Sequence, residues 1–236
     1  MAAARNRIRF ATLLVALVLV IGARPFLGSY VLGLPLSRLT LSALFFAGVY
    51  AVSRNRRVLV GGAVIGLFAL VSTWLATESE AVSIVVADHA TDLAFIMFVG
   101  ASILRTVVAH DEITADTIYG GICVYLLIGL GWDAAYSIVE YLNPGSFAMG
   151  GVPVSALDTG DTGLRSYPAL VYYSFVTLTT LGYGDIVPTT PQARVLSTAE
   201  AVFGQLFVAI FIARLVGLQL AQARGGGEDR GQTPDS

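Results

Sequence analysis

The chain has no lysine, a single cysteine, two histidines and few charged residues for its 236 positions. The lone Cys123 excludes an intrachain disulfide, and its apolar neighbours favour a buried, inert thiol. There is no Cys/His cluster with metal-ligand spacing and no phosphate-binding loop, so we expect neither an enzyme nor a cofactor. All 14 basic residues are arginine, and they form no basic patch, so we expect no nucleic-acid partner.

The composition that remains is that of a membrane protein. Hydrophobic residues make up 56% of the chain and charged residues 13%, and the mean hydropathy is +0.75. These values are typical of an integral membrane protein and exclude an ordinary soluble domain. We therefore predict an all-α membrane protein whose immediate surroundings are membrane lipids.

Six segments have the apolar character of membrane-spanning helices, which need about 20 residues to cross a bilayer core. The first follows Arg5, Arg7 and Arg9, a pattern that also fits a signal peptide, but removing it would leave an odd number of spans. After it we expect an interfacial connector at 26–36. We predict six transmembrane helices, at 8–23, 37–53, 58–77, 81–108, 115–141 and 195–222.

The arginines indicate how these spans are oriented. With six spans and both ends inside, ten of the 14 arginines fall on the cytoplasmic side, where basic residues are favoured. The other four are Arg24, Arg38, Arg165 and Arg194. We therefore expect a multi-pass protein of the cell membrane with cytoplasmic N and C termini.

One stretch, 177–185, reads Thr-Leu-Thr-Thr-Leu-Gly-Tyr-Gly-Asp and is suited to presenting backbone oxygens to a bare cation. Glycine tolerates backbone angles that other residues disfavour, so alternating Gly182 and Gly184 with larger residues allows successive carbonyls to point the same way. The hydroxyl of Thr180 adds one more oxygen. Such oxygens replace a cation's hydration shell, as in a selectivity filter. Gly-Tyr-Gly by itself is usually an ordinary turn, but the longer motif in a membrane protein favours a filter.

This motif resembles the signature of the tetrameric potassium-channel family, with leucine where the family usually has valine or isoleucine. The resemblance implies that Gly184 lets the chain leave the pore and that four chains surround one axis, so we predict a homotetrameric pore. Potassium ions are then the permeant ligand. They are coordinated by the Thr180 hydroxyl and by the carbonyls of Thr180, Leu181, Gly182 and Tyr183.

The resemblance extends to residues around the motif. It places Asp185 at the outer mouth and Tyr173 behind the filter as a support. Some family members have a glutamate at the position of Val176, where it bonds the mouth aspartate. Valine cannot form that bond, so we expect Asp185 to use another partner, with Tyr173 as the candidate.

The chain approaches the motif through a polar turret, 143–166, and a short apolar stretch, 167–179. At about 1.5 Å per residue, this stretch is too short to cross a bilayer, so we expect a re-entrant pore helix. Ser166 is a suitable N-cap, and Pro168 suits the first turn. The carbonyl end of such a helix carries partial negative charge, which would stabilise a cation in the membrane centre.

The last span is expected to line the inner cavity. Gly204 is a candidate gating hinge, because glycine weakens a helix by about 1 kcal/mol relative to alanine; close helix packing is the alternative. Glu200 is an acid within the same span, facing either the cavity or a neighbouring helix. Arg214 is expected to reach lipid headgroups.

A six-span layout of the voltage-gated type should carry arginine at every third position of its fourth segment. Here that segment has only Arg105, whereas steep voltage control needs about three or four charges per subunit. We therefore expect weak or no voltage dependence. The domains we predict are a four-helix, sensor-like domain at 1–112, a pore domain at 113–223 and a disordered cytoplasmic tail at 224–236.

Two acids in the fourth segment, Asp88 and Asp92, lie four residues apart and share a helix face. They either pair with Arg24 or Arg38 across the bundle or mark a solvated outer helix end.

We thus expect a passive, potassium-selective channel, and two alternatives stay open. A poorly selective cation channel would be favoured by the loss of Tyr183 or Gly184, and both are present. A potassium transporter subunit usually repeats the loop within one chain and keeps one filter glycine. This chain has one loop with both glycines.

Overall fold

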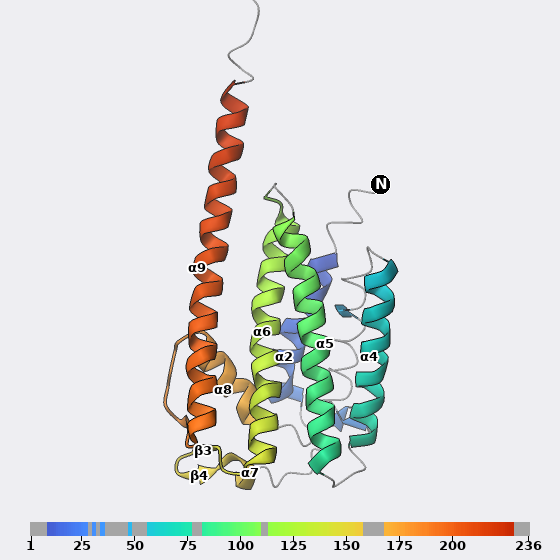
Figure 1. The fold of residues 1–236 in the computed structure, drawn as a ribbon, viewed down its shortest axis with the longest axis vertical. Helices are drawn as coiled ribbons and strands as arrows, with labels where there is room; N and C mark the ends of the chain where they lie inside the picture. Colours follow the sequence, from blue (N-terminus) through green and yellow to red (C-terminus); the bar gives the residue numbers. More distant parts are fainter. Residues whose placement is uncertain are drawn as a thin grey trace, which may run out of the picture.

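The computed structural model is a bundle of long helices with a small sheet at one end (Figure 1). It describes residues 9–27, 30–31, 34–35, 47–48, 56–76, 82–109, 113–157 and 168–228. The helices are α2 (Arg9–Leu27), α4 (Arg56–Ala76), α5 (Val82–Val108), α6 (Ala115–Leu142), α7 (Val154–Leu157), α8 (Pro168–Leu178) and α9 (Pro191–Glu228). The strands are β1 (Tyr30–Val31), β2 (Leu34–Pro35), β3 (Phe147–Met149), β4 (Val152–Pro153) and β5 (Ile186–Pro188).

Three of the described helices are long and apolar enough to cross a membrane, at Val82–Val108, Ala115–Leu142 and Pro191–Gln222. Helices α2 and α4 contain shorter apolar stretches, Phe10–Gly22 and Val58–Ser72. The span expected at 37–53 lies outside the described residues except for 47–48, which are helical. The all-α membrane class is confirmed, and the number of six spans stays a prediction.

Helices α5 and α6 pack together at the centre of the bundle, with α4 against α5 and α2 against α6 (Figure 1). Their shared core is built from aliphatic and aromatic side chains, among them Leu13, Leu17, Phe95, Val99, Ile103 and Leu127. On the far side of α4, Val64 and Phe68 are 62% and 65% exposed. A helix that packs in a bundle and also contacts lipid needs apolar side chains both on its buried face and on its outer face.

The acids of the fourth segment lie inside this bundle. Asp88 and Asp92 are 4% and 8% exposed, so they do not form a solvated helix end. Ser72 on α4 donates a hydrogen bond of 2.7 Å to Asp88 Oδ1. The partners expected for these acids, the side chains of Arg24 and Arg38, lie outside the described residues.

Helix α8 packs between α6 and α9, which also contact each other. A second core of Tyr136, Phe147, Leu170, Tyr173, Ile186 and Ala193 joins these helices to the sheet. In the sheet, β3 pairs antiparallel with β4 and with β5, and Ala148 lies opposite Val187. The turret is therefore tied directly to the chain that follows the filter motif.

Helix α9 extends well beyond the other helices at the end away from the sheet (Figure 1). It continues to Glu228, past the end expected at 222 and into the segment expected to be a disordered tail; residues 229–236 lie outside the described part of the chain. Only 6% of its membrane-length window is buried within the chain. Most of α9 is therefore left for contact with lipid or with other chains.

Candidate functional site

The filter motif begins where α8 ends, and its first amides turn back toward that helix. The N–H groups of Leu181 and Gly182 both donate to Val176 O, at 2.9 and 3.2 Å. The described chain has no cis peptide bond, and in a planar trans peptide the carbonyl points opposite to the N–H. The carbonyls of Thr180 and Leu181 therefore point away from α8. The expected N-cap, Ser166, lies outside the described residues.

The backbone of the motif alternates in handedness. Thr180, Gly182 and Gly184 have φ angles of 56°, 59° and 75°. Thr180 is the one non-glycine residue with positive φ in the described part of the chain. For a β-branched residue this conformation is an outlier, and such strain is concentrated at functional sites. Alternation of left- and right-handed angles turns successive peptide groups the same way.

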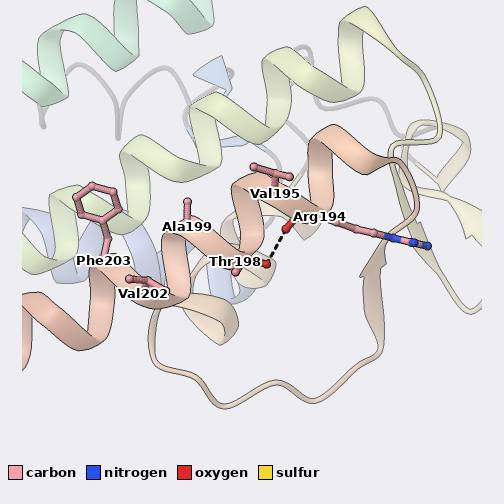
Figure 2. Close-up of a pocket in the computed structure, with 6 residues that line it drawn as sticks. All are labelled: Arg194, Val195, Thr198, Ala199, Val202 and Phe203. Carbon is pink, nitrogen blue, oxygen red and sulfur yellow. Dashed lines mark hydrogen bonds between the residues drawn. The ribbon is translucent and has the colours of Figure 1, made fainter.

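The part of the chain that the structure describes leaves residues 179–185 of the motif uncovered. All residues from 179 to 185 are exposed, and the side chains of Leu181 and Tyr183 are 56% and 67% exposed. Helix α9 has a shallow hollow that is lined mainly by apolar side chains (Figure 2). Its lining residues are Arg194, Val195, Thr198, Ala199, Val202 and Phe203.

Tyr173 does not bond Asp185, and its support of the filter stays a prediction. Its hydroxyl donates to Ser197 Oγ on α9 at 2.6 Å, and its ring packs 5.3 Å from Tyr136 and 5.2 Å from Phe147 between centroids. The partner of Asp185 is instead the preceding residue, Tyr172.

The Tyr172 hydroxyl donates to Asp185 Oδ2 at 2.7 Å. Successive helical residues point about 100° apart, so Tyr173 faces the α6–α9 core while Tyr172 faces the chain beyond the motif. The hydrogen bond to Asp185 raises the pKa of Tyr172 to about 12. The expectation that Tyr173 holds the aspartate was therefore wrong by one residue.

Gln205 of α9 reaches the innermost residue of the motif. Its Nε2 lies 3.1 Å from Thr180 Oγ1, which itself donates to Thr179 O at 2.7 Å. The sequence reading missed Gln205, although an amide in an apolar span was a signal. At the neighbouring Gly204, an added Cβ would lie 2.3 Å from Leu178 O. The structure therefore shows the close-packing alternative there, and the hinge stays a prediction.

Two acids of this region are fully buried and bind neighbouring elements. Glu200 faces α6 and α8, where it accepts a hydrogen bond from the Tyr136 hydroxyl and lies 2.5 Å from Ser174 Oγ. Glu140, at the end of α6, accepts from the amides of Gly145, Phe147 and Ser155 at 2.8, 2.9 and 3.2 Å. Glu140 thereby holds the turret, because the fold brings its three amide partners together.

Arg214 does not behave as a lipid-facing side chain. Its Nη1 and Nη2 donate to Val107 O and Val108 O at 2.8 and 2.7 Å. The last carbonyls of a helix lack intrahelical donors, so the guanidinium caps the end of α5. The expected reach to lipid headgroups is replaced by a link between the fourth segment and α9.

Comparison with known proteins identifies the region around this site. Residues 146–218 match the family model described as ion channel. The delayed-rectifier potassium channel regulatory subunit KCNS1 of Pan troglodytes and that of Macaca mulatta are each 34% identical over 73 residues, covering 31% of this chain and 14% of theirs. The potassium voltage-gated channel subfamily A member 10 of Mus musculus is 37% identical over 54 residues, covering 23% of this chain and 11% of its own.

The chain matches only a small part of the length of these relatives. No solved structure matches the chain. The matched region contains most of the turret, α8, the filter motif and most of α9. Residues 146–218 thus match ion channels and the relatives are potassium-channel proteins, which supports a channel and not an enzyme.

Proposed function

We propose that four copies of this chain form a potassium-selective channel in the cell membrane, with residues 180–184 as the filter. The observation that carries the proposal is the alternation of positive φ at Thr180, Gly182 and Gly184. Together with the amides bonded back to Val176, it supports a column of carbonyls on the side away from α8. In this proposal potassium is held by the Thr180 hydroxyl and by the carbonyls of Thr180, Leu181, Gly182 and Tyr183.

We infer a tetramer because one chain supplies only one column of carbonyls and leaves apolar side chains near the pore exposed. A single column of carbonyls cannot enclose an ion, and non-helical backbone at membrane depth needs protein or a water-filled pore around it. Leu181 and Tyr183 are exposed, and so are apolar residues of α9, including Val195 and Phe203 at 69% and 60%. Packing of this surface against neighbouring chains would bury these side chains and bring four filters together.

Voltage dependence is proposed to be weak or absent. Across Val82–Val108 the only arginine is Arg105, and one charge moved through 100 mV supplies about 2.3 kcal/mol. The segment also buries two acids, Asp88 and Asp92. We propose that the sensor-like domain at 1–112 supports the pore domain at 113–223 and does not sense voltage.

The positions of two arginines and of the sheet at opposite ends of the helix bundle support the proposed orientation in the membrane. Arg105 lies in the last turn of α5, and Arg214 binds the carbonyls of that same end. The sheet of β3, β4 and β5 lies at the opposite end of the bundle (Figure 1). With basic residues favoured inside, the filter exit faces outward and both termini are cytoplasmic.

The proposal is tested by reconstituting the purified chain in lipid vesicles and measuring reversal potentials under potassium and sodium gradients. We expect the reversal potential to follow the potassium gradient and a voltage ramp to give no steep sigmoidal conductance. Chemical crosslinking in the membrane should stop at four chains. Equal permeability to sodium would contradict selectivity. Absence of current from the chain alone, with current restored by another channel subunit, would contradict the homotetramer.

A further inference from the structure

Glu200 is a buried acid that touches three helices of the pore region. It lies on α9 and is 0% exposed. One carboxyl oxygen, Oε2, accepts a hydrogen bond from the Tyr136 hydroxyl of α6. The other, Oε1, lies 2.5 Å from Ser174 Oγ of α8. The carboxyl group therefore lies at the junction of the outer helix, the pore helix and the inner helix.

Among the residues that the structure describes, the groups facing Glu200 offer no positive charge. The titratable groups that interact with it are Tyr125, Asp133 and Tyr136 on α6 and Tyr173 on α8. All of them are neutral or negative. An ionised carboxylate buried without a cationic partner is strongly unfavourable, whereas a neutral acid with satisfied hydrogen bonds is tolerated.

The Ser174 hydroxyl makes two short contacts with oxygen atoms but carries only one proton. Ser174 Oγ lies 2.7 Å from the backbone oxygen of Gly129 and 2.5 Å from Glu200 Oε1. A hydroxyl carries a single proton, and a backbone oxygen only accepts. If Glu200 were ionised, one of these two short contacts would join two acceptors with no proton between them. Both contacts are satisfied when Ser174 donates to Gly129 and Glu200 donates to Ser174.

We propose that Glu200 is held as a neutral carboxylic acid and that, in this form, it is the positioning residue that fixes the pore helix behind the filter. The inference rests on the proposed channel function. Ser174 precedes Val176 by two residues on α8, and Val176 O holds the Leu181 and Gly182 amides. Glu200 thus acts on the filter backbone through Ser174 and α8, in place of the glutamate that this chain lacks at Val176.

The first test reads the protonation state without using conduction. Infrared spectra of the reconstituted protein at neutral pH should show a protonated-carboxyl C=O stretch that shifts in D₂O. The band should be absent from Glu200→Gln, so that it appears in the difference spectrum. Ser174→Ala removes the acceptor of the carboxyl proton, so the band should move to higher frequency. A difference spectrum with only carboxylate bands would overturn the proposal.

The second test measures whether potassium selectivity depends on a neutral, correctly placed group at position 200. Glutamine mimics it, because its NH₂ donates to Ser174 and its carbonyl accepts from Tyr136. We expect Glu200→Gln to keep the potassium-to-sodium permeability ratio within about twofold. Glu200→Asp keeps an acid but withdraws it by one methylene, and it should lower the ratio at least tenfold. Equal behaviour of the two variants would overturn the positioning role.

The two tests also separate this inference from the channel proposal. If the wild-type protein is not potassium-selective, the proposed function fails whatever the infrared band shows. If the wild type is selective and the band is missing, only the inference about Glu200 fails. Should Glu200→Gln not assemble, the frequency shift in Ser174→Ala decides the protonation state, and an unshifted band there would contradict it.

Discussion

Tyr172 and Asp185 are joined by a hydrogen bond of 2.7 Å between the phenol and carboxylate Oδ2, just beyond the filter motif. The other carboxylate oxygen, Oδ1, accepts from the Ile186 amide at 3.0 Å. The aspartate therefore links the pore helix to the start of β5, which pairs with the turret strand β3. Through these contacts the filter is held at its outer end by α8 and by the sheet.

Tyr172→Phe should weaken the outer end of the filter while leaving the ring in place. The variant removes the donor to Asp185 Oδ2, so non-conducting filters should be favoured relative to conducting ones. We expect faster decay of potassium current in vesicles or planar bilayers, with selectivity retained. Tyr119→Phe, at an exposed tyrosine of α6, is the matched control. Identical decay in wild type and Tyr172→Phe would contradict the support role.

The hydrogen bond between Tyr172 and Asp185 also determines the pH at which Tyr172 ionises. Asp185 raises the pKa of Tyr172 from 10.0 to about 12, so the bond's contribution is complete below pH 10 and is lost as pH rises through 12. We expect current decay to be independent of outer pH between about 6 and 9. A spectrophotometric titration of wild type minus Tyr172→Phe should show one tyrosine ionising near pH 12. Ionisation near pH 10 would show that the bond does not form in solution.

Gly182→Ala should abolish selective potassium flux. Residue 182 has φ of 59°, and a side chain in the left-handed region costs about 1–2 kcal/mol. That cost is repeated in every chain of a tetramer, so the carbonyl column should not form. Gly217→Ala on α9 is the matched control, because an added Cβ there meets nothing within 4 Å. Normal selective flux in Gly182→Ala would show that the filter assignment is wrong.

Glu140→Gln should destabilise the turret. The carboxylate accepts three amide protons, and an amide side chain replaces one acceptor oxygen with a donor that faces an N–H group. Leaving buried polar groups unpaired costs about 1–3 kcal/mol. We expect a lower unfolding temperature in detergent and faster amide exchange at Gly145 and Phe147. Unchanged exchange at both amides would contradict the anchoring role.

Arg214→Ala should loosen the end of α5. Removing the guanidinium leaves Val107 O and Val108 O without their donors, and a charge-assisted bond contributes about 1.5–3 kcal/mol. Hydrogen exchange over residues 104–109 should rise about tenfold or more. Arg105→Ala, an exposed arginine in the same turn, is the control and should leave exchange there nearly unchanged. Equal protection in both variants would exclude the cap.

The membrane class and the filter motif were predictable from local information. Composition alone separates an apolar chain from a soluble one, and Gly182 and Gly184 are readable because a particular backbone conformation needs glycine at those positions. The short length of the pore helix follows from the apolar run before the motif. These features depend on neighbours in the chain, so they can be read without knowing the fold.

The partners of polar side chains could not be read this way. Asp185 is bonded by Tyr172 and not Tyr173 because the rotation of α8 decides which tyrosine faces the filter exit. Glu200 faces Tyr136 and Ser174, and Arg214 caps α5, because helices far apart in the sequence pack at particular angles. The sequence by itself determined that the chain is typical of a membrane protein and where its filter motif lies. Only the tertiary structure decided which side chains hold the segments around that motif, since those contacts depend on the orientation of whole helices.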